Sequence, residues 1–256
     1  MDKKIYFASD FHLGSPNIEE SHKREKIILE WLCEIEKDAK AIYLLGDVFD
    51  FWFEYKKVIP KGFVRFLGKL AQIIDNGIEV HLIVGNHDLW IDSYLNEEIG
   101  LKIHHNSIII EEQSKKIYIG HGDGLGEGDY FYKFLKKIFI SKTCKWLFSQ
   151  LHPDLALSIA HKWSRSSRKN KEDKFISEDK EILFGFCKKM QKINPVDYYV
   201  FGHRHIPMNI RIDSKSEYFN AGDWISNYSY VTLYEGVLSL KKRFENKKNL
   251  NLSVKH

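Results

Sequence analysis

Residues 42–50 are Ile42-Tyr43-Leu44-Leu45-Gly46-Asp47-Val48-Phe49-Asp50, an apolar run that ends at a glycine and a carboxylate. A short run of aliphatic and aromatic residues followed by glycine is typical of a buried parallel strand. Asp47 would then lie at the carboxyl end of this strand, where open α/β sheets bind their ligands. The stretch therefore predicts an α/β fold with a functional site at this end of the strand.

Polar residues also follow four other apolar runs of the chain. They are Asp10-Phe11-His12 after residues 4–9, Asn86-His87-Asp88 after 80–85, His121-Gly122-Asp123 after 116–120, and His203-Arg204-His205 after 198–202. In most cases a glycine precedes the polar group and lets the backbone turn sharply. Because this ending recurs five times along the chain, we expect the polar groups to form one composite site.

Strands and amphipathic helices alternate in the first third of the chain. Apolar residues recur at helical spacing over residues 19–38 and 62–76, and Asn76-Gly77 is a typical C-terminal stop. The order strand, helix, strand, helix, strand predicts parallel strands covered by helices.

The later part of the chain predicts a hairpin, a helix and a series of short strands. The hairpin pairs residues 107–112 with 116–120 and turns at Gln113-Ser114. The helix covers residues 177–193, with Ser177 as its N-cap. The expected short strands are residues 197–201, 208–212, 218–220, 230–234 and 237–241.

Composition places the chain among ordinary globular proteins. Of its 256 residues, 43% are hydrophobic and 29% are charged. No apolar run approaches the roughly 18 to 20 residues that span a bilayer, and the apolar stretch before Asp10 is too short for a secretory signal. Three widely spaced cysteines, Cys33, Cys144 and Cys187, favour a reduced, cytoplasmic setting.

Residues 126–174 break the strand rhythm with a helical pattern that is aromatic and basic. Between Lys133 and Lys174, eleven Lys or Arg face three Asp or Glu, a net charge of +8 in a chain whose total is +4. We expect a cap over the site that suits an anionic, partly apolar substrate. An ordinary helix pair with solvated lysines is the alternative. The predicted core is then residues 1–125 and 175–245, followed by a flexible tail, 246–256.

The composite site carries oxygen and nitrogen donors but no thiolate. Its candidate metal ligands are Asp10, His12, Asp47, Asn86, His121, His203 and His205. Such a mixture suits Mn, Fe or Zn. Seven donors are too many for one ion with an open position, but they suit two ions that share a carboxylate and a water. Two ions about 3.5 to 4 Å apart can clamp a phosphoryl group and lower the pKa of the bridging water.

The five polar blocks resemble the motifs of the calcineurin-like metallophosphoesterases, in the same order. The resemblance implies a four-layer α/β/β/α sandwich with a dinuclear site. It implies one metal held by Asp10, His12, Asp47 and His205, and another held by Asp47, Asn86, His121 and His203. It also implies that Asp47 bridges the ions and that His87, paired with Asp88, is an acid or binds the substrate phosphate. A merely supporting role for His87 is the alternative.

Within this family, residues 47–52, Asp-Val-Phe-Asp-Phe-Trp, are similar to a run in the UDP-2,3-diacylglucosamine diphosphatases of lipid A biosynthesis. Asp129 follows His121 by eight residues, as in that branch. The resemblance implies substrate contacts at Asn86, His87, Asp129, Ser167, Lys171, Lys174 and His203. Better-known members have arginine where this chain has His87, and asparagine where it has Lys171.

This closer resemblance implies that water attacks the α phosphorus of the UDP-lipid and releases UMP. It also implies two divalent ions, most simply Mn²⁺, and a peripheral protein on the cytoplasmic face of the inner membrane, held by its basic cap. Cap aromatics such as Phe134 would contact acyl chains or pack on the sheet. The sequence carries no signal for the oligomeric state.

Two other functions stay open at this stage. His87 favours a metallophosphoesterase that acts on another phosphomonoester or phosphodiester. A non-catalytic basic scaffold, for example for nucleic acid, would use the charge of residues 133–174. An intact set of seven ligands argues against the scaffold, and we expect no nucleic acid partner.

Overall fold

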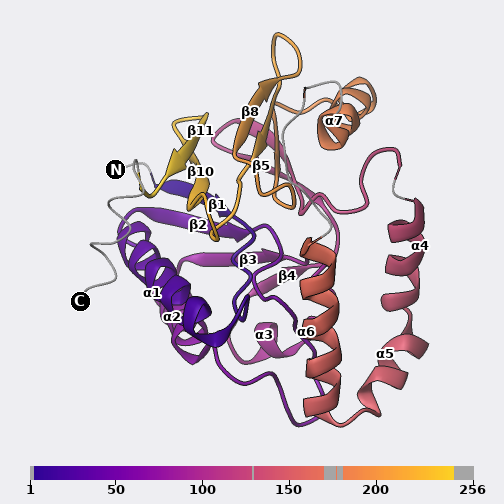
Figure 1. Ribbon diagram of the computed structural model, residues 1–256. Coiled ribbons are helices and arrows are strands. Elements are labelled where there is room, and N and C mark those ends of the chain that lie inside the picture. Colours follow the sequence, from indigo (N-terminus) through magenta and orange to yellow (C-terminus); the bar gives the residue numbers. More distant parts are fainter. Residues whose placement is uncertain (1–2, 129, 170–176, 178–180, 245–256) are drawn as a thin grey trace.

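The computed structural model describes residues 3–128, 130–169, 177 and 181–244, and between residues 161 and 169 it describes the side chains of Lys162 and Ser164. Two sheets form the centre of the protein (Figure 1). The first has the order β11-β10-β1-β2-β3-β4, with strands Val237–Lys242, Ser229–Tyr234, Lys4–Ala8, Ala39–Leu44, Glu79–Ile83 and Lys102–His104. The second has the order β5-β6-β7-β9-β8, with strands Ile108–Glu112, Lys115–Ile119, Tyr198–Phe201, Glu217–Asn220 and Met208–Arg211.

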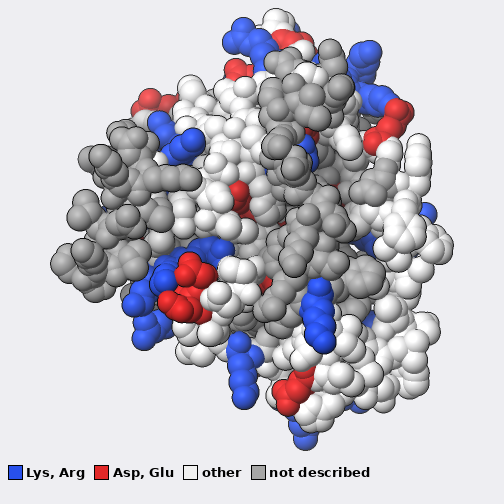
Figure 2. Space-filling model, in the orientation of Figure 1, with Lys and Arg blue, Asp and Glu red and all other residues white. Residues whose placement is uncertain are grey.

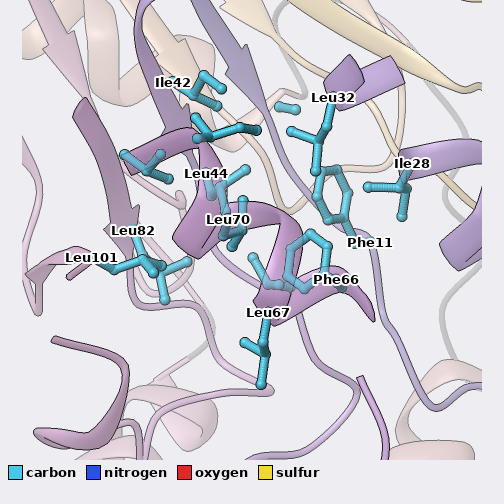
Figure 3. Packing of buried hydrophobic residues seen from close by; sticks show 14 of the residues in the cluster. Phe11, Ile28, Leu32, Ile42, Leu44, Phe66, Leu67, Leu70, Leu82 and Leu101 are labelled. Carbon is cyan, nitrogen blue, oxygen red and sulfur yellow. The ribbon is translucent and has the colours of Figure 1, made fainter. Parts of the chain in front are cut away.

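Three apolar layers hold these sheets and their helices together. Helices α1 (Ile18–Ile35) and α2 (Val64–Asp75) bury Ile28, Leu32 and Phe66, among others, against the first sheet (Figure 3). Phe7 and Val200 lie in the layer between the two sheets, and α7 (Ile182–Ile193) packs on the second sheet. The order helix, sheet, sheet, helix confirms the predicted four-layer α/β/β/α sandwich.

Parallel pairing brings the strand ends to common edges. β1, β2, β3 and β4 are parallel neighbours in the first sheet, and β6, β7 and β9 are parallel neighbours in the second. The loops after the strands also bond across the sheets, since the Gly222 carbonyl accepts from Ser9 Oγ at 3.1 Å and the Asp10 carbonyl accepts from Trp224 N at 3.2 Å. The carboxyl ends of both sheets therefore meet in one region.

Helices α4 (Tyr130–Phe139), α5 (Lys142–Ser149) and α6 (Pro153–Lys169) lie beside the sandwich (Figure 1). The helical pattern predicted for this region is confirmed for the described residues. Phe148 of α5 packs on Trp90 at 4.6 Å between ring centroids, and Trp90 Nε1 donates to the Phe139 carbonyl at 2.7 Å. The expected tail, residues 246–256, lies outside the described residues.

Two details differ from the sequence-based expectation. Helix α7 begins at Ile182, so the predicted start at Ser177 is wrong. The reason is tertiary: the Glu181 carboxylate, just before the helix, is buried and accepts from Arg204 Nε at 3.1 Å. In addition, strand β4 and the short helix α3 (Tyr94–Glu97) have no counterpart in the prediction. In the described part of the chain, no helix combines the length and apolar character that crossing a membrane requires.

Candidate metal centre

The five strand ends place the predicted donors in two adjoining groups. In the first, His205 Nε2 lies 3.2 Å from Asp10 Oδ1 and 3.3 Å from His12 Nε2. Asp10 and His12 follow β1, whereas His205 follows β7 of the other sheet. One donor atom from each of these three residues lies within 4.8 Å of the others, a spacing that one cation can bridge.

The second group gathers around His121, which follows β6. His121 Nε2 lies 3.4 Å from Asp47 Oδ2 and 3.1 Å from Asn86 Oδ1. His203 completes the group, with its donor atom within 4.8 Å of those of Asp47 and His121. A hydrogen bond between His121 Nδ1 and the Leu45 carbonyl, 2.7 Å long, directs Nε2 toward the other donors.

Asp47 belongs to both groups through one oxygen. Its Oδ2 lies 3.6 Å from His12 Nε2 and 3.4 Å from His121 Nε2. The other oxygen, Oδ1, accepts from the backbone N–H of His87 at 2.8 Å, so the carboxylate cannot rotate freely. This position suits a carboxylate shared by two cations.

The electrostatics of the donor groups favour binding of a cation. Burial by itself raises the pKa of Asp47, yet the charges of His121 and His87 hold it well below its usual range. Burial lowers the pKa of His121, but Asp47 raises it to about 10. Asp10 Oδ1 and His12 Nδ1 are buried without a hydrogen bond to any described residue. Buried carboxylates that draw positive charge, with donor atoms left over, fit a bound cation.

The backbone is strained where the donors stand. Five of the seven candidate ligands have left-handed backbone, with φ of 56° at Asp10, 43° at His12, 51° at Asp47, 67° at His203 and 54° at His205. Such angles cost a side-chain-bearing residue about 1 kcal/mol each, and they concentrate at functional sites.

Glycines beside the donors serve two different purposes. Gly46 has a φ of 87°, so it supports the sharp turn that the sequence suggested. Gly85 does not have a positive φ, but an added Cβ would overlap the carboxylate and backbone of Asp47. There the absence of a side chain permits close approach of two loops.

His87 contacts Asp50 rather than Asp88, so the predicted pairing with Asp88 is wrong. Asp88 instead accepts from the backbone N–H groups of Gly85 at 2.7 Å and Val48 at 2.9 Å, because its side chain turns back toward the loops. His87 Nδ1 lies 3.1 Å from the Asp50 carbonyl, and Nε2 lies 4.0 Å from Asp47 Oδ2. The ring is thus directed at the shared carboxylate.

Of the other predicted substrate contacts, the structure describes only some. Asp129, Lys171 and Lys174 lie outside the described residues, and Ser167 is in α6 with a side chain that is not described. Asn86, His87 and His203 lie at the metal groups.

Sequence reasoning missed three neighbours of the site. Asp50 stood in a recognised motif but was given no role, although His12 Nδ1 lies 3.7 Å from its Oδ1. Asp223 Oδ2 lies 3.9 Å from His205 Nδ1, in the loop after β9, and the sequence analysis assigned this residue no role. Ser164 of α6 bonds to Asp50, and no local pattern in a helix could reveal that contact.

Comparison with protein families decides the classification. The family described as calcineurin-like phosphoesterase matches residues 3–207. The chain belongs to the calcineurin-like phosphoesterases. In keeping with a family that uses divalent metals, this phosphoesterase has a candidate metal site at the expected motif positions.

Several curated proteins are similar to this phosphoesterase over most of their length. The UDP-2,3-diacylglucosamine hydrolase of Porphyromonas gingivalis is 35% identical over 246 residues, covering 90% of this chain and 94% of the relative. The enzymes of that name from Histophilus somni and Haemophilus influenzae are 28% and 27% identical, covering 79% and 90% of this chain and 84% and 94% of theirs. Among solved structures, a phosphoesterase from E. coli is 17% identical to this chain, with a TM-score of 0.45. The match covers 93% of this chain and 92% of that structure, and the family membership does not depend on it.

Proposed function

We propose that this phosphoesterase hydrolyses the pyrophosphate bond of UDP-2,3-diacylglucosamine. Water attacks the α phosphorus, and the products are UMP and 2,3-diacylglucosamine 1-phosphate. The observation that carries this proposal is the 35% identity to a UDP-2,3-diacylglucosamine hydrolase over 94% of that enzyme. Two adjoining donor groups that share Asp47 Oδ2 support the same reaction class.

The donor sets suit two divalent ions, which we propose are Mn²⁺. Asp10, His12, Asp47 and His205 would hold one ion, and Asp47, Asn86, His121 and His203 would hold the other. The donors are oxygens and imidazole nitrogens, and the cysteine sulfurs are not among them, which favours Mn, Fe or Zn over a soft metal. When bound, the ions would acidify a water and neutralise charge on the phosphoryl oxygens.

The protein's own residues would orient the substrate around these groups. His87 has a side chain that is 11% exposed and faces the shared carboxylate, so it can meet a phosphoryl oxygen and assist the leaving group. His203 and Asn86 would border the same phosphoryl group. For Asp129, Ser167, Lys171 and Lys174, contacts with the nucleotide and phosphates remain a proposal from sequence spacing, as does the boundary of the cap at residues 126–174.

The acyl chains would meet the apolar surface of α4 and α5. Phe131, Phe134 and Trp146 are 74%, 60% and 61% exposed, which favours lipid contact over packing for these three. Phe139 and Phe148, in contrast, pack on Trp90. In the view of Figure 2, the described surface over α4 and α5 is mostly uncharged, although both helices also carry lysines. We therefore propose peripheral association with the cytoplasmic face of the inner membrane through this surface.

The decisive experiment measures UMP release from UDP-2,3-diacylglucosamine in detergent micelles with added Mn²⁺. We expect release by the wild type and its loss, by at least about 100-fold, in Asp47→Ala, because one carboxylate serves both donor groups. Asp75→Ala, an exposed carboxylate at the end of α2, is the matched control and should keep full activity. Hydrolysis of bis-p-nitrophenyl phosphate without UMP release would retain the chemistry and reject the lipid substrate.

A further inference from the structure

One side chain of α6 reaches the loops of the metal centre. Ser164 is 4% exposed, and its Oγ donates to Asp50 Oδ1 at 2.9 Å. The same Oγ lies 3.2 Å from His87 Nδ1. Ser164 is 114 residues from Asp50 and 77 from His87 in sequence, so only the folded cap helix brings the three together.

These contacts indicate that His87 Nδ1 carries a hydrogen. The backbone carbonyl of Asp50 can only accept, so the hydrogen between it and His87 belongs to Nδ1. The Ser164 hydroxyl donates its one hydrogen to the Asp50 carboxylate, and its oxygen accepts from the Nδ1–H of His87. With Nδ1 held in this way, the other ring nitrogen, Nε2, faces Asp47 and lies 4.0 Å from its Oδ2.

We propose that Ser164 is a positioning residue that fixes the ring orientation of His87. The hydroxyl joins the Asp50 carboxylate to Nδ1, so the ring is held from its far side while Nε2 stays directed at the candidate site. This inference rests on the proposed function only in assuming that His87 contacts the phosphoryl group. It also means that the position of α6 determines the orientation of the His87 ring in the core.

The three side chains do not act as a hydrolytic triad. A nucleophilic serine needs an exposed oxygen and a base that takes its proton. Ser164 is buried, and it gives its hydrogen to Asp50, while the nitrogen of His87 that faces it carries a hydrogen of its own. The arrangement therefore orients His87 rather than activating Ser164.

The test compares Ser164→Ala with Ser164→Thr, which restores a hydroxyl, and with Ser158→Ala. Ser158 is exposed on the same helix and donates only locally, to the Asp154 carbonyl at 2.8 Å. Alanine suits a helix interior, so loss of folding is not expected in either alanine variant. The first readout is the kcat and KM for bis-p-nitrophenyl phosphate, a substrate without a lipid.

We expect Ser164→Ala to lower kcat by about 2- to 10-fold with KM unchanged, the usual range for one lost hydrogen bond. Ser164→Thr should recover most of this loss, and Ser158→Ala should match the wild type. An equal kcat in wild type and Ser164→Ala, or no recovery by threonine, would overturn the proposal.

The second readout does not depend on turnover. The nitrogen NMR spectrum of the full-length, histidine-labelled chain with zinc, a diamagnetic ion, should show a signal of protonated His87 Nδ1, assigned by its disappearance in His87→Gln. In Ser164→Ala, this signal should shift, because the Nδ1 hydrogen keeps only the Asp50 carbonyl as its acceptor. An unchanged spectrum would contradict the role of Ser164 even if UDP-2,3-diacylglucosamine proved not to be the substrate.

Discussion

His203 illustrates how the metal centre is built at the scale of single residues. Its φ of 67° is one of five left-handed angles among the candidate ligands. The conformation is stabilised locally, since the His203 N–H donates to Asp10 Oδ2 at 2.9 Å. His203 therefore adopts an unfavourable backbone conformation that directs its imidazole into the site. The free-energy cost of this conformation should be measurable.

We predict that His203→Gly is more stable than His203→Ala by about 1 kcal/mol in chelator-treated protein. Both variants lose the imidazole, and only the backbone preference differs between them. Urea unfolding gives the two free energies. The matched pair Asp75→Gly and Asp75→Ala, at the last residue of α2, should show the opposite order because glycine weakens a helix. Equal stability of the two His203 variants would refute the strain argument.

At the scale of residues, the sequence predicted the candidate metal ligands more reliably than the hydrogen-bond partners of the site residues. Asp10, Asp47 and His121 could be named because each directly follows a strand-like run. The partner of His87 could not, because spacing favoured the adjacent Asp88, whereas the contact with Asp50 depends on which way a loop turns. Ser164 was out of reach, since a serine within a helical pattern gives no sign of a contact 114 residues away.

At the scale of elements, some aromatic residues of α4 and α5 pack on the core and others are exposed. Phe148 packs against Phe53 at 4.8 Å between centroids and against Trp90, which attaches α5 to the core. Trp146, on the same helix, is 61% exposed. One face of the helix is therefore structural, and the other is available to a lipid surface.

We predict that Trp146→Glu weakens binding to vesicles containing anionic phospholipids by about 10-fold, because it removes an apolar side chain that would be buried and adds a repelled charge. Cosedimentation with the vesicles measures the effect. Ile193→Glu is the control, since Ile193 is 76% exposed but ends α7 and is not part of α4, α5 or α6. Equal weakening by both substitutions would show that the vesicles do not select α5.

Periodicity located most elements but not all of their ends. The hairpin of β5 and β6 turns at Gln113 and Ser114 as expected, because two strand patterns flank a polar pair. The start of α7 was misplaced because a tertiary contact of Glu181 decides it. Strand β4 has three residues, too few for a pattern, and its pairing with β3 defines it.

At the scale of the whole molecule, the metal centre joins two sheets. Asp10, His12, Asp47 and Asn86 follow strands of the first sheet, and His121, His203 and His205 follow strands of the second. Periodicity alone predicts strands without saying how sheets stack, so the four layers came from the family resemblance. Ions held by donors of both sheets would stabilise the stacking itself.

We predict that chelation lowers the melting temperature of the wild type by roughly 5–10 °C, since ions present well above their dissociation constant add several kcal/mol. Added Mn²⁺ should restore the melting temperature, as followed by circular dichroism. Asp47→Ala should respond much less, because it lacks the carboxylate common to both groups. A response to chelator as large as that of the wild type would place the stabilising ions elsewhere.

The strand order also has a consequence for synthesis of the chain. β1 lies between β2 and β10 in the sheet, and β10 follows β1 by more than two hundred residues in the sequence. His205 likewise completes a donor group that begins with Asp10. During synthesis, β1 therefore lacks one of its neighbours while the donor groups that contain His203 and His205 are unfinished. These two groups can hold their ions only after residue 205 has been added.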